Sequence, residues 1–175
     1  MDVRLVGPSV WTFLHALPWC IEPSQAEPLM LALTNVLPCR YCRESLAYSL
    51  QQRPVRAERP IQFAVWLWQL HNAVNQKLGK PLVNVTSALR RRISHAEMTI
   101  ALTDFLQAVA LNYPERPEEG DKIKHGNFFQ VLARIIELRL DNLGTALESR
   151  DQMYAWVLSE FGLGDDRSVL EQLRV

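Results

Sequence analysis

The chain has 175 residues, of which 48% are apolar, and its formal net charge is zero, so it can bury the core of one domain or of two small ones. Its apolar runs fall well short of the roughly 20 residues that span a bilayer, and its N-terminus lacks the charged-then-apolar order of a signal peptide. We therefore expect a soluble chain that has no signal peptide and no membrane partner.

Charge divides the chain into two halves of opposite sign. Residues 1–92 hold 11 Lys and Arg against 5 Asp and Glu, a net charge of +6, whereas residues 93–175 hold 8 against 14, a net charge of −6. The basic half suits a phosphate-bearing ligand, and the acidic half suits docking against it. Nucleic acid is not expected as a partner, because the basic residues are scattered except for Arg90-Arg91-Arg92, a triplet that fits a solvated helix end.

The sequence predicts an all-α fold, because no stretch alternates apolar and polar residues as a half-buried strand does. Proline at a first turn, a capping box and a terminal glycine mark the helix ends. Four helices joined by short loops, which together form a bundle, are predicted from Gly7-Pro8-Ser9 to Leu17, from Ser24-Gln25-Ala26-Glu27 to Val36, from Pro38-Cys39 to Leu50, and from Pro60 to Leu78 before Gly79.

After Val83 the predicted helices form a second unit. A capping box at Ser94-His95-Ala96-Glu97 opens a helix that reaches about Asn112, and an acidic loop follows over 113–121. Further helices are predicted at about 127–140, 151–161 and 166–173. We therefore expect two domains, residues 1–92 and residues 93–175.

A faint internal repeat relates the two units. Phe13-Leu14-His15-Ala16 is echoed by Phe105-Leu106-Gln107-Ala108, and Gln62–Leu67 by Gln152–Val157, at offsets of 92 and 90 residues. A decayed second copy of the first bundle would explain this pattern. Chance similarity between amphipathic helices would explain it equally well.

Cys39 and Cys42 form a C-x-x-C pair directly after Pro38. At the start of a helix this spacing brings the two sulfurs together, so the pair can close a disulfide. The partial positive charge of the helix N-terminus, with Arg40 and Arg43 nearby, is expected to favour the thiolate and so to speed disulfide exchange.

Two other kinds of site use the same C-x-x-C spacing. A structural zinc needs four ligands, and Cys20, His15 and His71 would have to converge on the pair from scattered positions, so no metal is expected. A thioredoxin-type site follows a strand, which this sequence does not predict. Cys20 lies among apolar residues and fits an inert buried thiol better than a redox role.

A second polar cluster lies at the end of the fourth predicted helix. His71 and Asn75 are spaced i, i+4, and Asn72 and Asn75 are spaced i, i+3, so these three side chains share one helix face. Lys77 and Lys80 follow, where two cations can bind phosphate oxygens. A lone histidine would indicate packing, whereas this combination indicates a ligand. A dithiol and a ligand site together indicate a thiol oxidase with a bound cofactor.

Three motifs follow one another across residues 5–83. They are a Gly-x-x-x-Trp-x-x-x-His run, a Pro-Cys-x-x-Cys turn and a His-Asn-x-Val-Asn-x-x-Leu-x-Lys-Pro run, found at Gly7–His15, Pro38–Cys42 and His71–Pro81. In this order they resemble the Erv/ALR family of FAD-dependent sulfhydryl oxidases. The Gly-Pro-x-x-Trp form of the first motif is most similar to the versions from large DNA viruses.

The resemblance implies a four-helix bundle with a short fifth helix that holds FAD beside the C-x-x-C pair. The aromatic and histidine rings would pack around the cofactor, the amides would bond it, and the lysines would face its phosphates. The cofactor-binding residues implied are Gly7, Trp11, His15, His71, Asn72, Asn75, Lys77 and Lys80.

The resemblance also implies a reaction. A dithiol protein substrate would attack the disulfide at Cys39, Cys42 would be released beside the flavin, and two electrons would pass through FAD to O2 and produce H2O2. Family members often carry a further Cys pair after the Lys-Pro and a shuttle dithiol on a tail. In this chain Val85 occupies the position expected for the first cysteine of the further pair. No cysteine follows it in the sequence. Substrates would therefore reach Cys39 directly or through a separate thiol carrier.

Residues 84–175 lie outside the resemblance. Family members usually dimerise through their bundles, and a cofactor-free second copy would take the place of the partner, similar to the pseudo-domain of the quiescin-type relatives. The chain would then be a pseudo-dimeric monomer, with a homodimer as the other state left open. The alternative is an unrelated helical extension for partner binding.

The sequence leaves two further matters open. A helical interaction module that keeps the bundle but has no turnover is the alternative to an oxidase. No targeting segment fixes a compartment, and the viral likeness suggests the cytoplasm of an infected cell or a virion.

Overall fold

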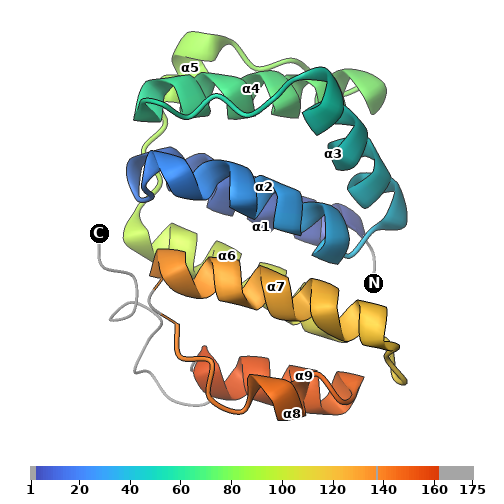
Figure 1. Cartoon of the computed structure of the whole chain (residues 1–175). Helices are drawn as coiled ribbons and strands as arrows, with labels where there is room; N and C mark the ends of the chain where they lie inside the picture. Colours follow the sequence, from blue (N-terminus) through green and yellow to red (C-terminus); the bar gives the residue numbers. More distant parts are fainter. Residues whose placement is uncertain (1–2, 137, 162–175) are drawn as a thin grey trace.

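The computed structural model describes residues 3–136 and 138–161, which form helices and connections with no strand among them (Figure 1). The expected all-α class is thereby confirmed. The first unit consists of α1 Val3–Ala16, the 3-10 turn η1 Leu17–Trp19, α2 Pro23–Val36, α3 Arg40–Gln52, α4 Pro60–Lys77 and the short α5 Val85–Arg90. The second unit consists of α6 His95–Leu111, α7 Glu119–Ile136, α8 Leu143–Ala146 and α9 Arg150–Glu160.

The two units meet through their first two helices. Helix α1 packs on α6 and α2 packs on α7, with α3, α4 and α5 on one side of these four helices and α8 and α9 on the other (Figure 1). Helices α2 and α7 run antiparallel, and the Gln25 side-chain amide donates to the Arg134 carbonyl at 2.9 Å. The Ser9 hydroxyl donates to the Asp104 carboxylate at 2.8 Å across the α1–α6 contact.

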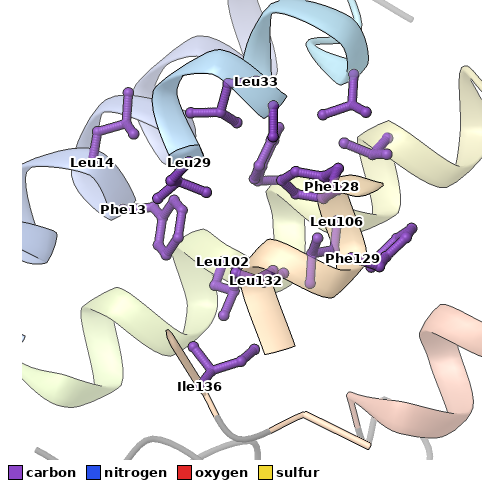
Figure 2. Packing of buried hydrophobic residues seen from close by; sticks show 14 of the residues in the cluster. Phe13, Leu14, Leu29, Leu33, Leu102, Leu106, Phe128, Phe129, Leu132 and Ile136 are labelled. Carbon is purple, nitrogen blue, oxygen red and sulfur yellow. The ribbon is translucent and has the colours of Figure 1, made fainter. Parts of the chain in front are cut away.

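Apolar side chains fill the space between these four helices, and we call them the inter-unit layer (Figure 2). The ring of Phe105 lies 6.2 Å from that of Phe13 and 6.0 Å from that of Phe128, measured between centroids, and all three side chains are fully buried. Burial of large apolar side chains is the main favourable term in folding. The layer also contains Leu29, Leu33, Leu102, Leu106 and Leu132.

The first two helices begin at residues other than those expected. Helix α1 starts at Val3 rather than Gly7, and Pro8 lies inside it. Helix α2 is capped by Glu22 and Gln25 rather than by Ser24 and Glu27. Pro23 accounts for the second shift, since proline is pre-set for the first helical position and the capping box then falls one residue before it.

Helices α3 and α4 agree closely with the sequence. Helix α3 has Cys39 as its N-cap, and α4 runs over Pro60–Lys77. Gly79 has a φ of +64°, the left-handed conformation that commonly ends a helix and that glycine adopts without a steric cost. The Lys80 amide then donates to the Asn75 carbonyl at 2.8 Å, which closes the end of α4.

In the second unit, α6 begins with the predicted Ser94 and Glu97 capping box. Helix α7 starts at Glu119, so the acidic loop is shorter than expected, because its last acidic residues lie in the first helical turn, where the helix dipole favours them. The short α8 was not predicted. The helix expected over 166–173 lies outside the described residues. Among the described helices, none is both long and apolar enough to cross a membrane.

We predict that Phe105→Ala destabilises the whole chain by about 3–5 kcal/mol, because it leaves a cavity where the two units meet. Urea unfolding measures this loss. The control is Ile100→Ala on the same helix, where the side chain is 64% exposed and the expected change is within about 0.5 kcal/mol. A loss for Phe105→Ala no larger than that of the control would show that the layer does not hold the units together.

Candidate functional site

The C-x-x-C pair forms the first turn of α3. Cys39 has extended backbone angles, as an N-cap should, and its sulfur accepts the backbone N–H of Cys42 at 3.2 Å. The Arg43 guanidinium donates to the Leu37 carbonyl at 2.6 Å and so holds the segment that enters the turn. Both cysteines are half-buried. The helix start therefore presents two adjacent sulfurs with a fixed backbone.

The electrostatics distinguish the two sulfurs. Burial is the main cause that raises the pKa of the Cys42 thiol, and together with the hydrogen bond and charge of Cys39 it brings that pKa to about 12, against smaller opposing effects that include the charge of Arg43. The charge of Arg43 favours the Cys42 thiolate as expected, but burial and Cys39 outweigh it, so the expectation that the thiolate is favoured overall is wrong for Cys42. Arg40 instead pairs with Glu44 at 2.8 Å on the exposed side of the helix. Cys42 keeps its proton at neutral pH while the pair is reduced.

Three rings from α1 and α4 form a compact cluster. The rings of Trp11 and His71 stack with centroids 4.0 Å apart and planes 4° from parallel. His15 Nε2 and His71 Nδ1 lie 3.0 Å apart, which is a hydrogen bond between the imidazoles. Sequence reasoning placed these residues at one site, and the structure brings all three together.

Both imidazoles of this cluster are neutral at physiological pH. Burial lowers the pKa of His15 to about 4, and the charge of Arg91 acts in the same direction. Burial also lowers the pKa of His71 to about 4, helped by His15 and Lys80. One neutral ring donates to the other, so the pair is a fixed, uncharged surface.

The remaining candidate residues differ in their hydrogen-bond partners and in their exposure to solvent. Asn72 exchanges two hydrogen bonds with the backbone of Val83, at 2.8 and 3.0 Å, and so fastens the segment after α4 to that helix. Asn75 is 8% exposed, and its side-chain amide has no partner within the described part of the chain. The Lys77 ammonium donates to the Ser45 hydroxyl at 3.1 Å, whereas Lys80 is exposed. Gly7 lies half-buried in α1.

Helix α4 connects the dithiol to the ring cluster. Lys77 touches Ser45, which lies one turn beyond Cys42 on α3, and His71 lies about 9 Å back along α4 at 1.5 Å per residue. Asn75 lies between these two positions. Along α4 the candidates therefore run from Lys77, which contacts Ser45 of α3, through Asn75 to His71 in the ring cluster.

A cavity of about 280 Å³ lies beyond His15. It is also lined by Arg91 and Arg92, which are exposed just beyond the end of α5, so the expected solvated helix end is confirmed and also borders the cavity. The triplet of arginines was the signal available, but its position beside His15 depends on the fold. The cavity is lined by His15, Ala16, Trp19, Cys20, Arg91, Arg92, Ile93, Ser94, His95 and Met98.

Cys20 is separate from the C-x-x-C pair. Its sulfur lies 3.4 Å from the Ala16 carbonyl oxygen, and burial raises the pKa of its thiol. Over residues 3–136 and 138–161, no three His, Cys, Asp or Glu side chains converge on a point where a metal ion would bind.

The site supports two kinds of chemistry. Two adjacent sulfurs at a helix start suit thiol–disulfide exchange. A line of rings, an unpartnered amide and two guanidiniums suits an elongated ligand with a planar ring system and anionic groups. The helical chain therefore combines a dithiol with a set of groups that could hold such a ligand.

Comparison with known proteins gives a family match for the first unit. Residues 8–94 match the Erv1/Alr family. The second unit lies outside the match. No solved structure matches the chain.

Curated relatives carry the same family name. The chain is 36% identical over 84 residues to the FAD-linked sulfhydryl oxidase ERV1 of Oryza sativa, a match that covers 44% of this chain and 43% of the relative. It is 34% identical over 82 residues to the protein of the same name from Arabidopsis thaliana, again over 43% of each. An African swine fever virus FAD-linked sulfhydryl oxidase is 28% identical over 85 residues, which cover 45% of this chain and 71% of the viral protein. The chain thus matches less than half the length of its plant relatives.

We predict that stability falls as the pH drops from 6.5 toward 4. Burial lowers the pKa of His15, His71 and His125 in the folded state, so the unfolded chain binds more protons in this window and is favoured there. Urea unfolding at pH 7.5 and pH 5 measures the difference. His71→Gln should reduce it, because one of the depressed groups is removed. Equal stability of the unsubstituted chain at both pH values would contradict this account.

Proposed function

We propose that the chain is an FAD-dependent sulfhydryl oxidase that converts protein dithiols into disulfides and passes the electrons to O2, forming H2O2. The observation that carries the proposal is the Cys39–Cys42 turn at the start of α3, a helix that contacts the end of α4 through Ser45 and Lys77, with the ring cluster farther back along α4. The names of the curated relatives support FAD and sulfhydryl oxidation. The viral relatives favour a virus-infected cell as the place of action.

The residues along α4 fit FAD. Trp11, His15 and His71 provide an uncharged surface of rings for the cofactor, and the side-chain amide of Asn75 has no hydrogen-bond partner among the described residues. Lys77 and Lys80 supply positive charge at the end of α4. Asn72 acts through its bonds to Val83, which position the segment after α4. When bound, the flavin accepts two electrons from the dithiol and makes them available to O2.

The two sulfurs have different tasks. A substrate thiolate attacks the Cys39 sulfur of the oxidised pair, a substrate–Cys39 bond forms, and the Cys39–Cys42 bond breaks toward Cys42. The second substrate thiolate then attacks the substrate sulfur and releases Cys39. The N–H of Cys42 stabilises negative charge on the released Cys39 sulfur.

Protons and electrons balance over the whole reaction. The substrate dithiol loses two electrons and two protons, and O2 gains the same number to become H2O2. The raised pKa of Cys42 makes it the sulfur that takes up a proton when the pair is reduced. Cys42 must give that proton up again when the pair is reoxidised.

We further propose that the second unit is a cofactor-free copy of the first, so that the chain is an internal pseudo-dimer. The Trp66 indole donates to the Arg53 carbonyl at 3.3 Å, and Trp156, 90 residues later, donates to the Asp141 carbonyl at 2.9 Å. Phe13 and its counterpart Phe105 are in ring contact, as equivalent residues are near a two-fold axis. Phe161, in the place of His71, is buried and apolar.

The purified chain is expected to be yellow and to release flavin on denaturation. It should consume O2 when dithiothreitol is added. Cys39→Ala and Cys42→Ala should each lower the rate by at least about 100-fold, equivalent to about 2.7 kcal/mol of activation free energy. Ile123→Ala on α7 is the control and should keep the rate, because this side chain is 54% exposed and lies on a helix that carries none of the candidate site residues.

Two results of these measurements would contradict the proposal. A colourless chain that binds no added FAD would favour a helical interaction module without turnover. A yellow chain whose activity survives loss of Cys39 or Cys42 would contradict the sulfur chemistry described above.

A further inference from the structure

The cavity beyond His15 has walls from both units. His15, Trp19 and Cys20 belong to the first unit, and His95 and Met98 belong to α6 of the second unit. Met98 is 2% exposed and also packs in the main core. The walls of the cavity therefore exist only because α6 packs against α1.

The volume of the cavity limits what it can hold. Sites for whole small molecules usually measure about 300–1,000 Å³, and this cavity measures about 280 Å³. It can accept one part of a ligand as long as FAD but not the whole ligand. His15 borders both the cavity and the ring cluster, so a ligand that lies against the rings can extend into the cavity.

The charge at the cavity favours an anionic group. The guanidiniums of Arg91 and Arg92 border it, and the charge of Arg91 lowers the pKa of His15. Arg92 lies over the Trp19 ring at 5.7 Å, a cation–π contact that joins the connection between the units to η1. The Glu97 carboxylate accepts hydrogen bonds from the capping Ser94, and the nearby charge of Arg91 also helps to lower its pKa. Helix α6 therefore supplies a wall and one carboxylate near Arg91, and the two arginines supply the positive charge.

We propose that α6 of the second unit forms one wall of the pocket that holds the phosphate-bearing, adenosine half of FAD. The inference rests on the proposed function and extends it, because a unit without the C-x-x-C pair or the His-Asn motif is then required for cofactor binding. The boundary between the units lies within the connection that lines this pocket, so the cofactor pocket spans both units.

The test fills the cavity from the α6 side. Met98→Trp places a larger side chain in the cavity, and Ala96→Trp adds the same side chain to the exposed side of the same helical turn. Each purified full-length chain is stripped of flavin and titrated with FAD, with binding followed by quenching of flavin fluorescence. Thermal unfolding and circular dichroism of each stripped chain report whether it is folded.

Met98→Trp should raise the Kd for FAD at least tenfold, while Ala96→Trp leaves it within twofold of the unsubstituted chain. An unchanged Kd in a folded Met98→Trp chain would overturn the inference and leave the proposed oxidase intact. If Met98→Trp does not fold, His95→Ala provides the second test at the same wall, with the same expected direction. Failure of the unsubstituted chain to bind FAD would instead overturn the proposed function, and this inference with it.

Discussion

The packing of α1 and α2 against α6 and α7 is the contact on which the rest of the structure depends. Phe13, Phe105 and Phe128 are fully buried there, and the layer joins the two units into one core. The same contact fixes where α1 lies relative to α6. His15 on α1 therefore faces the residues at the start of α6, and the cavity between them is a direct result of how the apolar layer packs.

Local signals predicted much of the fold. Gly79 and the Ser94–Glu97 box end and begin helices where expected, because each acts through bonds to its own neighbours. Helix α2 begins earlier than the sequence indicated, because Glu22 is its N-cap and Pro23 its first residue, whereas Ser24 was the expected N-cap. The sequence alone does not distinguish these two capping boxes. The four-residue α8 is too short for an apolar period to be recognised.

The candidate site was predictable where it depends on helix spacing and unpredictable where it depends on tertiary contacts. His71 and Asn75 share the face that their spacing requires. Nothing local could show that Asn72 would bond Val83, or that Lys77 would reach Ser45 on α3. The arginines of the connection are exposed, as the sequence indicates, but only the fold shows that Arg91 lies near enough to His15 for its charge to lower the pKa of that imidazole.

The covalent link between the two units changes how their contact responds to dilution. In a dimer of separate chains, the subunits part at low concentration and any shared pocket is lost with them. Here the connection over residues 91–94 keeps α1 and α6 in one molecule, so their association is intramolecular, with an effective concentration set by the short linker. The cavity beside His15 therefore forms within a single molecule, and its formation does not depend on the concentration of the protein.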